Sequence, residues 1–317
     1  MCYAFKEYDN FFIIRIAILK FAAIDIGSNA VRLLLARVII DDKQPFCRKE
    51  SLIRIPLRLG EDAFTQGRIS DVKIEQLIQT LIGFKHLITV YDPIDVMVCA
   101  TSAMREAENG EDILAAIQQH SGILCQIIDG KTEADIIYAN HFEQYLTTDG
   151  SYLYIDVGGG STELSLLSRG RCVVSQSFDI GTVRMLQGLV EDKTWKFMQK
   201  WIKKACADVR PITAIGSGGN INKVRKLAGS TKSKANRTIS YKKLMQVRRT
   251  LRAYTFEERV LKLAMRPDRA DVIMPACEIY LSVMRWGNIA AMYVPQIGLV
   301  DGMVHVMYKR HQQQGSC

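Results

Sequence analysis

Apolar segments that end in an aspartate and a small polar loop occur twice along this chain. The first is FAAIDIGSNAVRLLLARV, from Phe21 to Val38, and the second is YIDVGGGSTELSLL, from Tyr154 to Leu167. Each has the pattern of a strand, a loop that begins with aspartate, an apolar residue and glycine, and a second strand. Because the two aspartates, Asp25 and Asp156, are 131 residues apart, the copies predict two domains of similar design.

Between and after these copies, the apolar periodicity predicts alternating helices and strands. Residues 71–90 place apolar side chains on one helical face behind Ser70 as N-cap, and Thr255 with Glu258 forms a capping-box pattern. Further strands are expected at 95–100 and 123–128, and further helices from Gly130 onward and at 192–209, 240–253 and 271–286. This alternation predicts an α/β fold with a cleft between two domains, where ligand sites usually lie.

The loop of the second copy has the composition of a phosphate-binding turn. Three consecutive glycines, Gly158–Gly160, leave backbone N–H donors open to a ligand, and Ser161 and Thr162 add hydroxyl groups. The aspartate before them suits Mg²⁺, which prefers one or two carboxylates together with phosphate oxygens. Another small-residue loop, AIGSGGN, follows the apolar PITAI. One glycine-rich turn is weak evidence, but three such loops with two strand-end aspartates predict a phosphate site.

Composition narrows the class of protein. The chain has 317 residues, 48% of them hydrophobic, and no apolar run approaches the ~20 residues that cross a bilayer. FFIIRIAILKF near the start is interrupted by Arg15 and Lys20, so it does not read as a signal sequence. The eight cysteines form no CxxC pair, which argues against a zinc site and a disulfide framework. We therefore expect a cytoplasmic two-domain enzyme that does not bind membranes.

Six motifs, in this order, resemble the exopolyphosphatase and guanosine pentaphosphate phosphohydrolase family: DIGSNAVRLLL, ATSAMREAEN, IIDGKTEADIIY, DVGGGSTELSLL, AIGSGGNINKV and RADVIMPACEIY. The resemblance implies an α/β fold with two ribonuclease-H-like domains of the actin, Hsp70 and sugar-kinase type around a central cleft. We expect the domains at residues 1–128 and 129–317, with a last helix able to pack back on the first domain. Residues 1–18 extend ahead of the usual start of such chains, as an extra strand, a disordered segment or an overlong start.

The resemblance assigns catalytic roles to three residues. Glu133 in GKTEA matches the general base, Glu163 after GGGST matches a second essential carboxylate, and Arg105 in ATSAMRE matches the segment that faces the reacting phosphates. The chemistry agrees, because hydrolysis of an anionic phosphate needs positive charge on the transferred group and a carboxylate that deprotonates water. Without the resemblance, Arg105 would read as a partner of Glu106 or Glu108, and Glu133 as an ordinary first-turn glutamate.

Other residues that match the family motifs surround these three. The implied cofactor is Mg²⁺ or another divalent cation, and a homodimer is expected. The candidate metal ligands are Asp156, Glu163 and Asp25. The candidate phosphate ligands are Ser28, Asn29, Arg32, Thr101, Ser102, Gly158, Gly159, Gly160, Ser161, Thr162, Gly216, Ser217 and Gly218.

One segment carries the whole excess of positive charge. Residues 223–252 contain eleven Lys or Arg and no Asp or Glu, whereas the complete chain has a formal net charge of +9. Such a run is usually a solvated helix face, and a nucleic-acid site is the next general interpretation. Beside a phosphate cleft it also fits a track for a polyphosphate chain, with Lys232, Lys234, Arg237 and Arg269 as candidates. We expect a polyanionic phosphate, rather than nucleic acid, as the partner.

The leading functional prediction is release of terminal orthophosphate from inorganic polyphosphate. Hydrolysis of the 5′-phosphate of guanosine pentaphosphate uses the same chemistry and is the alternative. An ATP-dependent kinase or chaperone on the same fold would leave Glu133 and ATSAMRE without a use. A catalytically silent sensor of polyanions or alarmones would leave both carboxylates unexplained. The sequence does not distinguish between the two phosphatase substrates.

Overall fold

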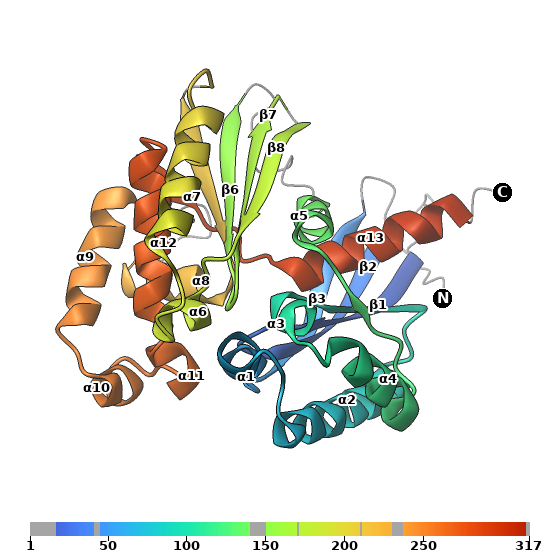
Figure 1. Ribbon diagram of the computed structural model, residues 1–317. Helices are drawn as coiled ribbons and strands as arrows, with labels where there is room; N and C mark the ends of the chain where they lie inside the picture. The colour runs from blue at the N-terminus through green and yellow to red at the C-terminus, as the bar shows by residue number, and fades with distance from the viewer. Residues whose placement is uncertain are drawn as a thin grey trace, which may run out of the picture.

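Two β-sheets, each with helices packed against it, organise the molecule (Figure 1). The computed structural model describes residues 17–40, 45–139, 150–169, 171–209, 211–229 and 237–314. We call the first sheet with α1–α5 and α13 the first lobe, and the second sheet with α6–α12 the second lobe. No helix in these described ranges is both long and apolar enough to cross a membrane.

Within the described ranges, the first sheet has five strands in the order β3-β2-β1-β4-β5. The central strand β1 pairs antiparallel with β2 and parallel with β4. Every residue of β1 from Phe21 to Ile26 is buried, as expected for a central strand that is covered on both faces. The strands are β1 (Ala17–Ile26), β2 (Val31–Ile40), β3 (Phe46–Ile55), β4 (Asp95–Ala100) and β5 (Gln126–Ile127).

The second sheet repeats this plan. Its order is β10-β11-β9-β6-β7-β8, so that β6 pairs antiparallel with β7 and parallel with β9, as β1 does with β2 and β4. The strands are β6 (Ser151–Val157), β7 (Thr162–Ser168), β8 (Arg171–Phe178), β9 (Ile212–Ser217), β10 (Thr238–Ser240) and β11 (Ala291–Tyr293). The repeated order confirms the α/β fold with two ribonuclease-H-like units.

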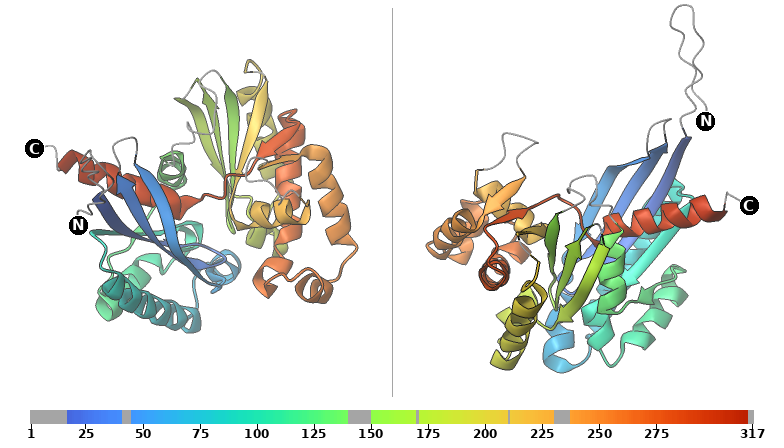
Figure 2. Two further views of the ribbon diagram at one scale, coloured as in Figure 1. Left: turned by 180° about the vertical axis from the view of Figure 1, so that it is seen from behind. Right: turned by 90° about the horizontal axis from the view of Figure 1, so that it is seen from above.

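Helices cover both faces of the first sheet. One face packs on α1 (Leu59–Gln66), α2 (Asp71–Tyr91), α3 (Ser102–Glu106) and α4 (Gly110–Ser121). The other face packs on α5 (Gly130–Tyr138) and on α13 (Leu299–Gln314), the last helix of the chain. In α13, the ring of Tyr308 lies 6.5 Å from that of Phe21 in β1, centroid to centroid. Figure 2 shows α13 running along this sheet in both views.

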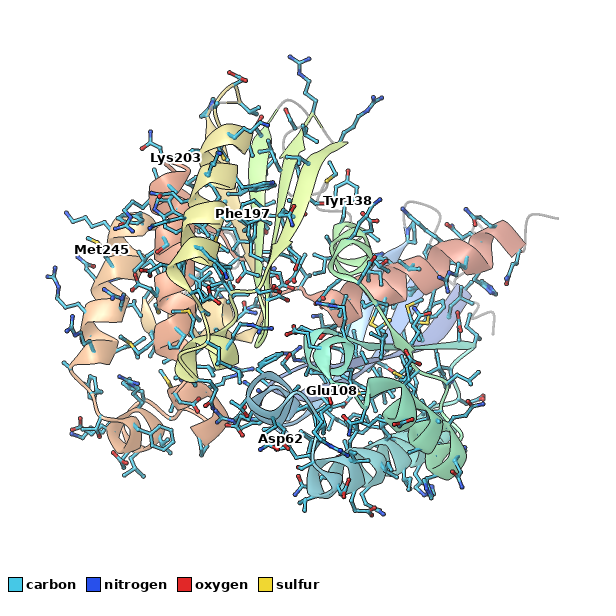
Figure 3. All side chains as sticks on the ribbon, in the orientation of Figure 1. Asp62, Glu108, Tyr138, Phe197, Lys203 and Met245 are labelled. Carbon is cyan, nitrogen blue, oxygen red and sulfur yellow. The ribbon has the colours of Figure 1, made fainter. Side chains whose placement is uncertain are left out.

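Seven helices among the described residues belong to the second lobe. They are α6 (Thr182–Leu186), α7 (Asp192–Ala205), α8 (Gly219–Leu227), α9 (Tyr241–Arg252), α10 (Phe256–Leu261), α11 (Pro267–Ala270) and α12 (Ile273–Trp286). The centre of its core is α12, most of which is fully buried. Aromatic side chains fasten α7 to the sheet, since Phe197 lies 5.5 Å from Phe178 between ring centroids (Figure 3).

Local sequence patterns predicted several elements closely. The strand at 95–100, the helix from residue 71 and the capping box between Thr255 and Glu258 are confirmed. Four expected elements are shorter in the structure. The strand at 123–128 keeps only Gln126–Ile127, and the helices α7, α9 and α12 begin or end within the predicted ranges. Ser70 does precede α2, but its hydroxyl donates to Asp62 instead of accepting from the helix.

Candidate active site

Glu133 lies in the first turn of α5, with one carboxylate oxygen left without a partner. The helix is started by Asp129, whose side chain accepts a hydrogen bond from the backbone N–H of Thr132 at 2.7 Å. The Glu133 side chain is buried, and its Oε2 has no hydrogen-bond partner. Burial raises the pKa of Glu133 well above its ordinary value, and the negative charges of Glu163 and Asp156 raise it further. A raised pKa makes the ionised carboxylate a stronger base towards a bound water molecule.

Glu163 lies beside this helix, on strand β7. The first residue of α5 packs against β8, since a Cβ on Gly130 would lie 2.6 Å from the Cβ of Ser177. The hydroxyl of Ser177 donates to Glu163 Oε1 at 3.0 Å, and that of Ser161 donates to the same oxygen at 2.6 Å. Burial and the charge of Asp156 raise the pKa of Glu163 to about 7, although the two serine bonds oppose this shift. Ser177 gave no sequence signal, because it lies in an ordinary edge strand.

Asp156 faces Glu163 across the β6–β7 hairpin, where the two residues are in register. The Ser217 hydroxyl, at the end of β9, donates to Asp156 Oδ1 at 2.6 Å. Burial raises the pKa of Asp156, while the Ser217 bond and the positive charge of Arg32 lower it. Of the expected metal ligands, Asp156 and Glu163 thus lie on neighbouring strands, each with one oxygen held by serine.

Asp25, the third expected metal ligand, forms an ion pair with Arg32 on the neighbouring strand. Burial raises the Asp25 pKa even though Arg32 lowers it. Because the guanidinium already neutralises this carboxylate, Asp25 is a weaker candidate metal ligand than Asp156. Arg32, expected to bind phosphate, therefore has a structural partner as well.

Three loops that the sequence predicted as phosphate ligands converge from both lobes. The Ser28 and Ser102 hydroxyls lie 2.8 Å apart. A Cβ on Gly159 would lie 2.9 Å from the Ser28 Cβ, and one on Gly160 would lie 2.5 Å from the Ser102 Oγ. Larger residues in the glycine loop would therefore push the lobes apart, which explains why this loop needs glycines.

Several predicted phosphate ligands lie at the edge of this cluster or beneath it. The Asn29 side chain donates to the Asp268 carbonyl at 3.2 Å, which joins the first loop to the second lobe. Thr101 is buried and its backbone N–H donates to Ile26 at 3.2 Å. The hydroxyl of the fully buried Thr162 donates to the Ile180 carbonyl, so the fold already uses this donor.

The third small-residue loop follows β9. Gly216 belongs to the strand, where a Cβ would lie 2.4 Å from the Met292 sulfur, so its role is in packing. Gly218 adopts φ 97°, which favours glycine, and a Cβ there would lie 3.3 Å from Asp156 Oδ1. A Cβ on Gly219 would lie 2.7 Å from the Arg269 guanidinium. This loop therefore lies between a site carboxylate and a cationic side chain.

Arg105 lies near both glutamates. Its positive charge lowers the pKa of Glu133 and of Glu163, although other effects on these groups are larger. Its Nη1 donates to the Ile128 carbonyl at 2.7 Å, which fixes the side chain at the end of the segment that leads into α5. Its possible partner Glu106 pairs with Arg184 instead. The other possible partner that the sequence suggested, Glu108, is exposed (Figure 3).

Two of the four track candidates lie within the described residues. Arg237 precedes β10 and donates to the Pro295 carbonyl at 2.7 Å. The strand β10 pairs antiparallel with β11, which runs parallel to β9. The start of β10 therefore lies at the same end of the strands as Ser217, and so does Arg237. Arg269 is half-buried, and burial and the charge of Arg32 lower its pKa. Lys232 and Lys234 lie outside the described residues.

Arg54 was missed by sequence reasoning. It forms a buried ion pair with Asp268 of the second lobe. Burial and the nearby charge of Arg32 lower the Arg54 pKa to about 10. Arg32, Arg54 and Arg269 therefore lie close together where the lobes meet. Arg54 lies in LIRIPLRLG, where apolar residues and arginines alternate as in any amphipathic strand, so the sequence held no signal for this pairing.

The overall arrangement is that of a known family. The model of the Ppx/GppA phosphatase family matches residues 51–311, which is most of the chain. This chain belongs to that family. Exopolyphosphatase 1 of Mycobacterium tuberculosis is 24% identical to it over 303 residues, covering 90% of this chain and 87% of that protein. Exopolyphosphatase 2 of the same species is 27% identical over 284 residues, covering 81% and 87%.

Solved structures of the Ppx/GppA family share the fold. The Aquifex aeolicus family member aligns with a TM-score of 0.73 at 24% identity, over 93% of this chain and 99% of its own. An exopolyphosphatase from Cytophaga hutchinsonii aligns with a TM-score of 0.78 at 23% identity, over 91% and 97%. As a Ppx/GppA member, the chain is a phosphatase, and its two-lobed fold is that of the family.

The carboxylates of the site fit a hard divalent cation. Within the described ranges, no three His, Cys, Asp or Glu side chains form a metal site by themselves. Asp156 and Glu163 on neighbouring strands, with the unpartnered Oε2 of Glu133 nearby, provide oxygen donors of the kind that Mg²⁺ prefers. Mg²⁺ commonly takes one or two carboxylates and completes its shell with water and phosphate oxygens.

Proposed function

We propose that this protein is an exopolyphosphatase, which hydrolyses the terminal phosphoanhydride bond of inorganic polyphosphate and releases orthophosphate. The observation that carries the proposal is the unpartnered oxygen of Glu133, buried beside Glu163 and Asp156. A buried carboxylate oxygen without a donor is costly unless a ligand, a water molecule or a proton satisfies it. The phosphatase family supplies the reaction class, and the names of the curated relatives favour polyphosphate.

Each group in the site has a role in this reaction. Glu133 orients the attacking water and accepts its proton at Oε2. Asp156 and Glu163 hold the divalent cation, which when bound supplies positive charge to the transferred phosphate. The Gly158–Gly160 loop donates backbone N–H groups to phosphate oxygens, and Arg105 adds a guanidinium near the two glutamates.

Guanosine pentaphosphate is the second candidate substrate, because the same groups could remove its 5′-terminal phosphate. The charge of the second lobe favours the polymer. The helix α9 carries basic side chains and no acidic ones between Tyr241 and Arg252, and most of its basic side chains are exposed. A compact nucleotide would contact few of these cations, whereas a long chain could contact many.

One assay tests the proposal against its alternative. Phosphate release with Mg²⁺ is measured in parallel from long polyphosphate, short polyphosphate, guanosine pentaphosphate and ATP. We expect the highest kcat/KM on long polyphosphate, and a kcat lowered by roughly 10²–10⁴ in the Glu133→Gln variant. Preference for guanosine pentaphosphate would assign the alternative activity, and preference for ATP would overturn both.

The assembly, cation and location that the sequence suggested stay part of this proposal. A homodimer is tested by size-exclusion chromatography with light scattering, and Mg²⁺ by comparison with Mn²⁺ and Ca²⁺ in the assay. Division into domains at residues 128 and 129 is tested by limited proteolysis. A cytoplasmic location is tested by cell fractionation.

A further inference from the structure

Arg184 joins the glycine loop of the second lobe to two helices of the first lobe. It lies in α6, and its Nε donates to the Gly160 carbonyl oxygen at 2.9 Å. Its Nη2 lies 2.6 Å from each carboxylate oxygen of Glu106 in α3, and its guanidinium carbon lies 4.2 Å from the ring centroid of Phe64 in α1. Only 12% of the Arg184 side chain is exposed. One guanidinium therefore contacts the loop and the opposite lobe at once.

The start of α6 also sets the direction of the peptide groups in the loop. The carbonyl oxygens of Gly158 and Gly159 accept hydrogen bonds from backbone amides of α6 at 3.0 and 2.8 Å. Together with the Arg184 bond, these contacts turn all three glycine carbonyls toward α6. In a planar trans peptide the N–H points opposite to the C=O, so the amides that follow these carbonyls face away from α6. Among the described residues, those amides donate to no turn or loop carbonyl.

We propose that Arg184 is a positioning residue that fixes the phosphate-binding geometry of the Gly158–Gly160 loop when the two lobes are in contact. The proposal rests on the function assigned above to this loop. If the lobes separate, Arg184 loses Glu106 and Phe64 together, and its hold on the Gly160 carbonyl weakens. Contact between the lobes and ordering of the loop are thereby coupled through one side chain.

The chemistry of the contact requires arginine. A guanidinium can direct one N–H to Gly160, present another to Glu106 and stack on Phe64 at the same time, because its donors lie in one rigid plane. A lysine ammonium keeps the charge but lacks this plane. The lobes also share an ion pair that does not touch the loop, between Arg58 and Asp271 at 2.6 Å. That pair provides a matched control for loss of an interlobe contact.

Hydrogen exchange of the loop amides tests the proposal without any turnover. Glu106→Gln and Arg184→Lys should speed exchange in a peptide that covers residues 157–162 by roughly 3- to 10-fold, since the Gly158 amide, which donates to the Ser161 carbonyl at 2.9 Å, is released each time the loop opens locally. Asp271→Asn should leave that peptide unchanged. Unchanged exchange in Glu106→Gln, or equal acceleration in Asp271→Asn, would overturn the positioning role.

A charge swap separates the loop contact from simple pairing of the lobes. The double variant Arg184→Glu with Glu106→Arg keeps opposite charges across the interface but loses the bond to Gly160. We expect exchange in the loop to stay fast in this variant. If the swap restores wild-type protection, the ion pair alone matters and the proposal is wrong.

Binding of inorganic phosphate provides the functional readout. By calorimetry with Mg²⁺ present, Glu106→Gln should raise the phosphate Kd by about 5- to 10-fold, the size of one charge-assisted contact, with Asp271→Asn within about twofold of wild type. If Glu106→Gln speeds exchange in the loop but leaves the phosphate Kd unchanged, the coupling between lobe contact and phosphate binding is wrong. Absence of polyphosphate hydrolysis by the wild-type protein would instead contradict the proposed function, and the exchange measurement would still decide the role of Arg184.

Discussion

Arg32 stands opposite Asp25 in the first hairpin, as Glu163 stands opposite Asp156 in the second. The two hairpins therefore share one design, but the residue that faces the aspartate is basic in the first and acidic in the second. In the first, the aspartate is neutralised within the protein by an ion pair. In the second, two carboxylates raise the local negative charge, which suits a cation or a proton. The repeated fold thus produces one ion pair, which is neutral within the protein, and one pair of carboxylates, which can bind a cation or a proton.

Replacing Glu133 by glutamine should lower kcat by roughly 10²–10⁴, the range for loss of a general base. The amide keeps the shape of the side chain but cannot accept a proton from water, so KM should change little. The matched control is Glu257→Gln, an exposed glutamate in the first turn of α10. A kcat within threefold of wild type would remove Glu133 from the mechanism.

The pKa of Glu163 predicts a loss of stability as the pH rises. Its ordinary value is 4.5 and its value in the fold is about 7, so the folded state binds more protons than the unfolded state between these values. Stability from this group is complete below the unfolded pKa and is lost as the pH rises through 7. We expect the free energy of unfolding to fall by roughly 1–3 kcal/mol across this window.

Urea unfolding in a chelator, at several pH values across that window, measures the effect. Glu163→Gln should make the slope shallower by the share that comes from this group, because glutamine does not ionise. The same slope in wild type and variant would show that other groups cause it. Added Mg²⁺ should reduce the slope in the wild type only, since a bound cation favours the ionised carboxylate.

Asp156→Asn should raise the Mg²⁺ concentration needed for half-maximal activity. The substitution deletes a charged oxygen ligand but keeps an oxygen that can accept from Ser217. The control Asp192→Asn removes an exposed carboxylate from the first turn of α7. Identical Mg²⁺ titrations for wild type and Asp156→Asn would show that Asp156 serves the loop structure alone.

Changing Lys232, Lys234 and Arg237 together to glutamine tests the polyphosphate track. KM for long polyphosphate should rise. Its salt dependence should flatten, since a variant that makes fewer phosphate contacts releases fewer counterions when the chain binds. Rates on the shortest chains should stay nearly unchanged. The control triple change, at the exposed Lys193, Lys196 and Lys200 of α7, removes the same charge elsewhere. A KM shift that is equal for all chain lengths would contradict the track.

Arg237 has a structural bond of its own, to the Pro295 carbonyl. The melting temperature of the triple variant is therefore measured beside its kinetics. A lowered melting temperature with equal KM changes on every substrate would assign the segment to structure alone.

The sequence predicted the parts of the site that depend on neighbouring residues. The strand-end aspartates and the glycine loop follow from short-range patterns, and both hairpins form as expected. The helix that begins at Gly130 and carries Glu133 in its first turn was likewise expected from the local sequence. Such patterns determine which residues end a strand or begin a helix, and so which side chains are near one another along the chain.

Contacts between the lobes were beyond sequence reasoning. Asn29 meets Asp268 across 239 positions, and Arg184 meets Glu106 across 78. Such pairs depend on how the two sheets pack, which no local period encodes. The direction of the Thr162 hydroxyl is another example, because a strand pattern does not say whether a threonine donates to a ligand or to a nearby carbonyl.

The return of α13 to the first sheet has a consequence for synthesis. The face of that sheet formed by Phe21, Leu34 and Met97 is covered by Met303 and Met307, near the end of the chain. While the ribosome is still making the second lobe, this apolar face has no α13 to cover it. The apolar face of the strands that are synthesised first is therefore covered last. Until α13 emerges, this face of the nascent chain is open to aggregation or to binding by chaperones.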